Sequence, residues 1–414
     1  MINDVFRIST LVFLIILAVG VFFMLYRLVF AITGFTKRIT FKEAKKNHKF
    51  AVLIPARNES NVISDLLTSL QNQDYDKNNF DVYVIVKSEK DKTIEICDKF
   101  GYKCFVEPNQ KCKGDALDFT IKHIYENNLS YDAFVIFDAD NIPTQSFLTE
   151  INKAVDAGYD IGIGYRNSKN WNDGWISAGT GLTFSLINSL SNKARTKFKM
   201  NCVFSGTGYF IRESVLSNFK GWPFKSLTED YEISMYATCN NLKTAYVENA
   251  EFFDEQPVDL KTSFKQRVRW VKGFTVARSL YSKKLFSKRG NFLSKLDFSL
   301  GVVPAGIIIA DCILYGAMQI ALLTWALIAG HPWVTYLLSF VYLNIGIYAA
   351  LFLFTLIQIL VEGKRIDMKL SRKIELLFCN PFYTALYVPI AIKAIFSKNI
   401  GWDTIAHNKT MTKK

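Results

Sequence analysis

Two carboxylates close an apolar run in "FVIFDADN" (residues 134–141). Asp138 and Asp140 are separated by one residue, and Asn141 follows them. Hard divalent cations prefer oxygen ligands, and Mg²⁺ is commonly held by one or two carboxylates together with substrate phosphates. Asp and Asn are also ordinary turn residues, so an isolated Asp-x-Asp equally fits a turn or a helix cap. The pattern therefore predicts a metal and phosphate site only in the company of other chemistry-bearing residues.

Three further groups of such residues follow in the chain. "FSGTG" (204–208) is a loop of small residues that can approach a ligand closely. "SLTEDYEIS" contains Glu229 and Asp230, which fit a general base or, alternatively, the acidic first turn of a helix. "KQRVRW" (265–270) lies within a basic stretch that also fits a helix on a membrane surface. Its candidate residues are Gln266, Arg269 and Trp270.

Strand-like and helical segments alternate around the first carboxylates. The expected strands are 50–56, 81–86, 103–107 and 133–140, and the expected helices are 61–73, 91–100 and 114–128. Strands without period-two polarity that alternate with helices indicate a parallel sheet covered on both faces. Such α/β sheets bind ligands outside the carboxyl ends of their strands. Asp138 and Asp140 fall at one of these ends.

Three apolar stretches exceed the roughly 20 residues that a membrane-spanning helix needs. They are residues 9–35, 298–329 and 333–361. Lys and Arg cluster after the first and the third, so the positive-inside rule places the N-terminus outside and residues 36–297 in the cytoplasm. Residues 374–397 are also apolar, but Pro381 and Pro389 interrupt them and basic residues follow. We expect an interfacial or re-entrant helix there, with a fourth span as the alternative.

The formal net charge of +13 gathers at the edges of the apolar stretches. Basic residues in that position meet anionic lipid, so we expect membrane lipid as a partner and no nucleic acid. The seven cysteines contain no CxxC pair, and four histidines are too few for a zinc cluster. We interpret the cysteines as reduced thiols of a cytosolic domain.

The motifs in their order resemble the membrane-embedded family 2 glycosyltransferases, which include cellulose, chitin, hyaluronan and poly-N-acetylglucosamine synthases. The matching pieces are "IPARNE", "KGDAL", "FDADN", "FSGTG", "LTED", "DEQP" and "QRVRW". The resemblance covers about residues 50–280 and the flanking apolar stretches. It implies a GT-A fold, which is a Rossmann-like α/β domain for nucleotide-diphosphosugars, in the cytoplasm and flanked by transmembrane helices.

The resemblance also implies roles for individual residues. Asp138 and Asp140 match the pair that holds a divalent cation, Mg²⁺ or Mn²⁺, and the sugar nucleotide. Asp230 matches the general base. The residues implied to contact diphosphate and acceptor are Gln266, Arg269 and Trp270. The other residues implied to bind the nucleotide sugar are Ala56, Glu59 and Lys113. The acceptor is expected at Ser205, Gly206, Thr207, Glu229 and Trp270.

One position departs from the family pattern. Val86 and Lys87 stand where the family commonly carries an acidic residue near the nucleobase.

We expect an inverting transferase that uses UDP-glucose or UDP-N-acetylglucosamine to build a β-linked extracellular polysaccharide. One alternative is a transferase that glycosylates a membrane lipid. Another, from a different class of protein, is a non-catalytic membrane scaffold or nucleotide-sugar sensor.

The expected domain order places the catalytic unit between membrane segments. The units are a transmembrane helix (1–35), a GT-A domain (36–257), a basic interfacial segment (258–297), two transmembrane helices (298–361) and a cytoplasmic loop, interfacial helix and tail (362–414). Three or four spanning helices form only a narrow channel. We therefore expect polymer export to need a homodimer or an accessory membrane partner.

Overall fold

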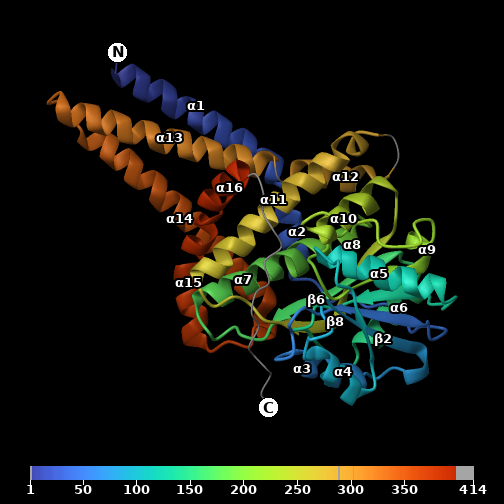
Figure 1. Ribbon diagram of the computed structural model, residues 1–414. Coiled ribbons are helices and arrows are strands. Elements are labelled where there is room, and N and C mark those ends of the chain that lie inside the picture. The colour runs from blue at the N-terminus through green and yellow to red at the C-terminus, as the bar shows by residue number, and fades with distance from the viewer. Residues whose placement is uncertain (1, 288–289, 302, 398–414) are drawn as a thin grey trace.

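The computed structural model describes residues 2–287, 290–301 and 303–397, and an eight-stranded mixed sheet forms the middle layer of its α/β domain (Figure 1). The strand order is β3-β2-β1-β4-β7-β6-β8-β5. The strands are β1 (Phe50–Pro55), β2 (Phe80–Val86), β3 (Lys103–Val106), β4 (Ala133–Ile136), β5 (Ile142–Pro143), β6 (Ile161–Ser168), β7 (Tyr209–Arg212) and β8 (Thr244–Asp254).

The first half of the sheet is parallel, as the sequence predicts. β1 pairs in parallel with both β2 and β4, and β2 pairs in parallel with β3. β4 ends at Ile136 rather than at residue 140. Asp138 and Asp140 therefore lie in the loop beyond the carboxyl end of a central strand.

Helices cover both faces of the sheet, because its strands are apolar on both sides. α3, α4 and α6 pack on one face, and α5 and α10 pack on the other. The helices of this domain are α3 (Ile63–Gln71), α4 (Thr93–Phe100), α5 (Lys113–Glu126), α6 (Phe147–Asp156), α7 (Trp175–Ile187), α8 (Lys193–Lys197), α9 (Glu213–Leu216) and α10 (Glu229–Cys239), with the short turns η1 (Lys77–Asn79) and η2 (Asn188–Asn192).

The second half of the sheet mixes strand directions. β7 runs antiparallel to β4 and β6, and β5 runs antiparallel to β8. β6 and β8 pair in parallel, with a register shift between Gly164 and Tyr165. Bulges of this kind turn side chains to new directions beside functional sites. Arg166 follows this shift directly.

Four helical stretches within the described residues are long and apolar enough to span a membrane. They are Asp4–Met24, Gly306–Ile328, Val334–Glu362 and Leu370–Phe396. The helices that contain the first three are α1 (Ile2–Met24), α13 (Val303–Ile328) and α14 (Val334–Glu362), and they run out of the domain side by side (Figure 1).

The first apolar stretch does not form one helix to residue 35. α1 ends at Met24, and α2 (Tyr26–Gly34) begins after a turn. Phe30 of α2 is buried against Ala194 and Met200 of the α/β domain. The apolar stretch up to residue 35 is therefore two helices: α1 contains the candidate span Asp4–Met24, and α2 packs on the α/β domain.

The helices after β8 lie between the sheet and the apolar helices (Figure 1). They are α11 (Leu260–Leu285), α12 (Phe292–Leu300), the turn η3 (Gly363–Arg365), α15 (Leu370–Ala385) and α16 (Tyr387–Phe396). α15 and α16 are separated at Leu386. Ile390 and Ala394 of α16 pack on Val268 of α11. The fourth apolar stretch thus contacts the domain along both of its helices, since α15 packs on α7.

Candidate active site

The loop after β4 is held in shape by the small-residue loop 204–208. The Asp138 backbone N–H donates to the Thr207 hydroxyl at 2.8 Å and to the Asn141 side-chain oxygen at 3.1 Å. Thr207 in turn donates to Asn141. Thr207 and Asn141 are fully buried. These bonds join two loops that are far apart in the sequence and fix the direction of the Asp138 carboxylate.

Lys113, the first residue of α5, joins three predicted site residues. Its Nζ donates to Asp138 Oδ1 at 2.5 Å and to the Gly206 carbonyl at 2.7 Å, and it lies 3.8 Å from Glu229 Oε1. Burial lowers the pKa of Lys113, but the carboxylates of Asp138 and Glu229 more than offset it, so the net shift of its pKa is upward. Lys113 is therefore a fixed positive charge at the carboxyl edge of the sheet.

Glu229 and Asp230 open α10; Glu229 is buried and Asp230 is partly exposed. The Tyr231 backbone N–H donates to Asp230 Oδ1 at 2.7 Å, which leaves Oδ2 on the side of Gly206. Burial raises the pKa of Asp230, against the opposing effects of the Tyr231 N–H and Lys113. Burial also raises the pKa of Glu229, to about 7. Raised carboxylate pKa values favour proton transfer near neutral pH.

α11 approaches the start of α10 at a glycine. A Cβ on Gly273 would lie 2.5 Å from Thr228 Cγ2 and 2.6 Å from Thr228 Oγ1. No residue with a side chain fits there without displacing Thr228. Gly273 thus brings the helix that carries Gln266, Arg269 and Trp270 against the residue that precedes the acidic pair.

The three predicted residues of α11 are only partly exposed. Gln266 Oε1 is buried and has no hydrogen-bond partner among the described residues. The Trp270 ring meets the Phe184 ring edge-to-face, with centroids 5.6 Å apart and planes at 70°. The basic segment predicted at 258–297 contains the 26-residue helix α11 and the first residues of α12, and the turn of α11 that carries Trp270 packs on α7.

The loop that follows β1, where the sequence predicts nucleotide binding, is bonded to the end of β2 and the segment after it. The Ala56 backbone N–H donates to the Ile85 carbonyl at 2.8 Å, and the Asn58 N–H donates to Asp91 Oδ2 at 2.9 Å. Asp91 also accepts the Thr93 N–H at 3.0 Å. These bonds tie Ala56 and the loop of Glu59 to the end of β2. Asp91, an acidic residue shortly after Val86 and Lys87, thus accepts hydrogen bonds from the backbone.

Asp138 and Asp140 fit a divalent cation that substrate phosphates complete. Among the described residues, no three His, Cys, Asp or Glu side chains gather to hold a metal by themselves. Asp140 accepts the Glu255 N–H at 3.0 Å, which orients its carboxylate. Burial raises the pKa of nearby Asp254 to about 6, Arg166 opposes this, and the charge of Asp140 raises it further. Excess negative charge at this edge is what a bound cation would neutralise.

Sequence reasoning missed two residues beside the site, the partly buried Arg166 and the buried Asp254. Arg166 Nε donates to Asp254 Oδ2 at 2.6 Å. Asp254 lies in "FDEQP", which contributed to the resemblance without a role for any residue, so a signal existed. Arg166 is a single arginine at the end of a strand and carried no spacing signal.

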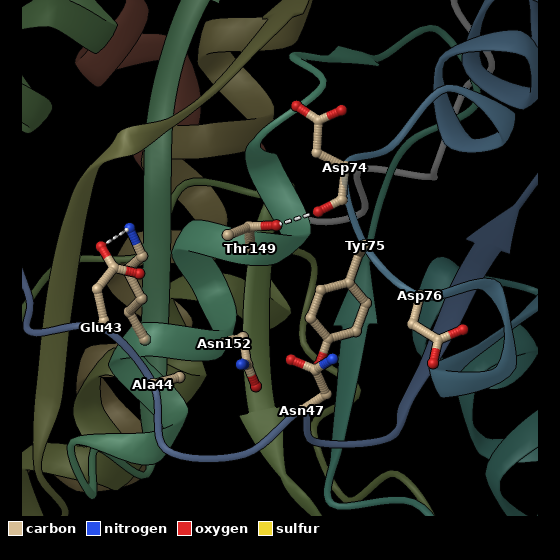
Figure 2. A pocket seen from close by; sticks show the side chains of 9 residues that line it. Glu43, Ala44, Asn47, Asp74, Tyr75, Asp76, Thr149 and Asn152 are labelled. Atoms are coloured by element: carbon tan, nitrogen blue, oxygen red, sulfur yellow. Dashed lines mark hydrogen bonds and ion pairs between the residues drawn. The ribbon is translucent and has the colours of Figure 1, made fainter.

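The pocket that opens elsewhere on the domain is unrelated to this cluster. It has a volume of about 170 Å³ and is lined by residues of the segment before β1 and of α6, among others (Figure 2). Glu43 pairs with Lys153 at 2.8 Å across its rim. Because it adjoins the segment that leads into β1, this pocket lies at the amino ends of the strands. It shares no residue with the candidate site.

The family model "Glycosyltransferase like family 2" matches residues 48–273, more than half of the chain. The chain belongs to this family. It is a family 2 glycosyltransferase, a class of enzyme that transfers a sugar from a nucleotide sugar.

Several known proteins are similar to the chain. "Probable glycosyltransferase YdaM" of Bacillus subtilis is 25% identical over 276 residues, which are 60% of this chain and 63% of that protein. The chain thus spans less than two thirds of that relative. Poly(ribitol-phosphate) beta-N-acetylglucosaminyltransferase TarS of Staphylococcus aureus is 36% identical over 62 residues, 15% of this chain and 11% of TarS.

The fold is similar to that of a solved mannosyltransferase, PcManGT from Pyrobaculum calidifontis, in complex with GDP-Man and Mn²⁺. The TM-score is 0.59 at 14% identity, over 96% of this chain and all of the other. At this identity the likeness shows the fold. It extends over the apolar helices as well as the α/β domain.

Proposed function

We propose that the protein is a membrane-bound inverting glycosyltransferase that builds a β-linked extracellular polysaccharide from a UDP-sugar, UDP-glucose or UDP-N-acetylglucosamine. The observation that carries the proposal is the arrangement around Gly206. Lys113 donates to its carbonyl, Asp138 accepts from the same Lys113, and Asp230 Oδ2 faces the glycine. The ammonium group of Lys113, the carboxylate of Asp138 and the carboxylate of the proposed base Asp230 thus all lie beside one glycine.

The residues divide the reaction between them. Asp230 accepts the proton of the acceptor hydroxyl, and general base catalysis of this kind contributes about 10² to 10⁴ in rate. Lys113 and Arg269 place positive charge near the diphosphate as negative charge builds on it. A divalent cation, Mg²⁺ or Mn²⁺, held by Asp138 and Asp140 would add further positive charge there. Direct attack by the activated hydroxyl inverts an α-linked donor to a β-linked product.

The acceptor occupies the side of Asp230 that faces α7 and α11. Trp270 offers the face on which a sugar ring stacks. Glu229 and the loop of Ser205, Gly206 and Thr207 border the same space. The donor lies on the side of Asp138 and Asp140, with the nucleoside toward Ala56 and Glu59 at the end of β1. Because Val86 and Lys87 replace the usual acidic residue, groups other than a carboxylate contact the nucleobase of the donor there.

The apolar helices support attachment to a membrane. We propose that α1, α13 and α14 span it, with the N-terminus outside and the catalytic domain in the cytoplasm. Lys37, Arg38 and Lys42 follow the first span on the cytoplasmic side. α15 and α16 pack on α7 and α11, which supports an interfacial helix pair over a fourth span. A homodimer or an accessory membrane protein would complete a path for a polymer.

Transfer to a membrane lipid is the second candidate. The observation that favours it is the position of the site beneath α11, α15 and α16, helices with exposed apolar side chains such as Leu280, Phe382 and Phe396. A lipid headgroup held at such a surface reaches the same base, Asp230. The catalytic residues are the same in both candidates, and only the acceptor differs.

The test is an assay of purified protein in lipid with a panel of UDP-, GDP- and CDP-sugars and Mg²⁺ or Mn²⁺. We expect nucleotide release and a long product with one UDP-sugar. Product size is measured by gel filtration after solvent extraction of lipids. A lipid that carries one or two sugars at saturating donor would overturn the polymer proposal and support the lipid acceptor. Transfer from a donor other than a UDP-sugar would overturn only the assignment of uracil as the nucleobase of the donor.

A further inference from the structure

A buried ion pair that the reaction scheme does not use lies beside the acceptor space. Arg166 is on β6, and Asp254 ends the neighbouring parallel strand β8. Arg166 Nε donates to Asp254 Oδ2 at 2.6 Å, and Nη2 contacts the same oxygen. Asp254 Oδ1 accepts from Gln256 Nε2 at 2.6 Å. Both carboxylate oxygens are engaged, so the orientation of the pair is fixed.

The guanidinium also reaches the loop that borders Asp230. Arg166 Nη1 donates to the Ser205 carbonyl at 2.5 Å. A Cβ on Gly206 would lie 3.8 Å from Arg166 Nη1 and 3.7 Å from Asp230 Oδ2. The arginine and the proposed base therefore flank the same glycine from two sides.

The flat face of the guanidinium supports an aromatic pair. Arg166 Cζ lies 3.6 Å from the centre of the Phe184 ring, and Phe184 meets Trp270 edge-to-face. A guanidinium that lies over the face of an aromatic ring is attracted to it by the ring's negative face. A continuous series of contacts thus runs from Asp254 through Arg166 and Phe184 to Trp270.

A direct role for Arg166 in binding a phosphate is disfavoured by these contacts. Its charge is neutralised by Asp254, and three of its nitrogens are already engaged. Its side chain is 12% exposed, and that of Asp254 is 2% exposed. The ion pair can therefore act on the substrate only through the Ser205 carbonyl and the Phe184 ring, which Arg166 contacts.

We propose that Arg166 and Asp254 form a positioning pair that holds the acceptor platform of Phe184 and Trp270 in register with Asp230. The inference rests on the proposed function, because the platform matters only if a glycosyl acceptor stacks on it. Misplacement by about 1 Å can slow an enzyme about 10²-fold. Lysine cannot replace Arg166, because an ammonium cannot bond Asp254 and Ser205 while lying flat on a ring.

The test compares Arg166→Lys, Phe184→Leu and Phe184→Tyr with the wild type. The acceptor probe is cellotetraose or chitotetraose, matched to the transferred sugar, and the donor reaction with water is measured alongside. We expect Arg166→Lys and Phe184→Leu to raise the acceptor KM about tenfold, with the donor KM and donor hydrolysis within about twofold. Phe184→Tyr keeps the ring and should stay within about twofold of the wild type.

A matched control is the buried pair of Arg195 and Asp297. Arg195 Nε donates to Asp297 Oδ2 at 2.9 Å, and its guanidinium lies 5.8 Å from the centres of two phenylalanine rings. The pair has the same chemistry, but it joins η2 and α8 to α2 and α12 and does not contact the Phe184 ring in the contacts described. Arg195→Lys should lower the melting temperature and leave the acceptor KM unchanged.

The possible results separate the inference from the proposed function. If the wild type transfers and Arg166→Lys changes kcat and stability but not the acceptor KM, the pair is only structural and the inference is wrong. If Arg166→Lys does not accumulate, equal acceptor KM values for Phe184→Leu and Phe184→Tyr would overturn it. If the wild type transfers to neither tetrasaccharide nor lipid, the proposed function fails and the inference falls with it.

Discussion

The two halves of the sheet share the same two apolar clusters, but they differ in the charged side chains packed beside them. β3, β2, β1 and β4 are parallel, and their side chains pack in apolar clusters on both faces. β7, β6, β8 and β5 run in mixed directions, and buried charges surround them. The buried charged residues are Lys193, Arg195, Glu248 and Asp254, and Arg166 beside them is partly buried.

The first half is the proposed donor side, and the second half carries the proposed acceptor side. Apolar packing tolerates volume-conserving substitutions, whereas a buried ion pair that loses one partner destabilises a protein by about 3–5 kcal/mol. We therefore infer that the donor side is robust and the acceptor side is sensitive to single changes. Lys113 connects the two sides, because it contacts Asp138 on one and Gly206 and Glu229 on the other.

Asp230→Asn should produce the largest selective loss. Without the base, we expect transfer to fall by about 10² to 10⁴, while UDP binding stays within about twofold. Transfer is measured with radiolabelled donor, and binding by calorimetry. Asp98→Asn, an exposed change on α4, serves as the control and should retain full activity. Weakened UDP binding in Asp230→Asn would contradict the division between donor and acceptor sides.

Asp140→Asn should affect the donor side instead. We expect loss of Mn²⁺-dependent UDP binding and of both transfer and donor hydrolysis, on the order of 10²-fold, because one oxygen ligand becomes a neutral amide. Excess EDTA should have the same effect on the wild type, and added Mn²⁺ should reverse it. Full activity in EDTA would exclude the metal role.

Gly273→Ala tests the contact between α11 and the start of α10. The new Cβ would meet Thr228 at 2.5 Å, so we expect a stability loss of about 1–3 kcal/mol and a tenfold or larger loss of transfer. The double variant Gly273→Ala/Thr228→Ala removes the clashing atoms and should regain part of both. Thr228 makes no side-chain cap bond, so the second change has little cost of its own. Absence of rescue would contradict the steric explanation.

Trp270→Ala should shorten the product more than it slows the chemistry. Loss of stacking costs about 1 kcal/mol, which shortens acceptor residence several-fold. Donor hydrolysis should change less than product length, measured by gel filtration. Trp270→Phe keeps an aromatic face and serves as the control. Equal losses in both measurements would indicate that Trp270 acts in the chemical step.

Glu229→Gln should give the smallest effect, on the pH dependence of stability. Burial raises the pKa of Glu229 to about 7 from an ordinary value of 4.5, so the native state holds its proton more tightly than the unfolded state. Its contribution to stability is complete below pH 4.5 and is lost as the pH rises through about 7, by on the order of 1–3 kcal/mol. Melting temperatures in detergent at several pH values measure this. Glu229→Gln should reduce the decline, and an unchanged decline would contradict the assignment.

The parallel half of the sheet and its acidic loop could be predicted from sequence. Apolar runs at β1, β2 and β4 and helical patterns between them are local signals, and each fixes one element. The position of Asp138 at a strand end follows from the same pattern. Helix ends moved by one to three residues, as for α3, because caps and turns are decided by local bonds.

Contacts between elements that are distant in the sequence could not be predicted in the same way. The first apolar stretch divides into α1 and α2 because Phe30 finds a buried place against Ala194, a contact that hydropathy alone does not report. The resemblance named Gln266, Arg269 and Trp270, but it did not show that Gly273 brings their helix against Thr228.

The sequence by itself determined the family, the parallel strands and the identity of the acidic and basic motif residues. Only the tertiary structure decided which of them meet, that Lys113 joins Asp138 to Gly206 and Glu229, and that Arg166 pairs with Asp254. The physical reason is distance along the chain. Periodicity and motif spacing report contacts within a few residues, whereas Arg166 and Asp254 are 88 residues apart and Lys113 and Gly206 are 93 apart. Such pairs leave no spacing pattern, and only the packing of β6 against β8 and of α5 against the sheet brings them together.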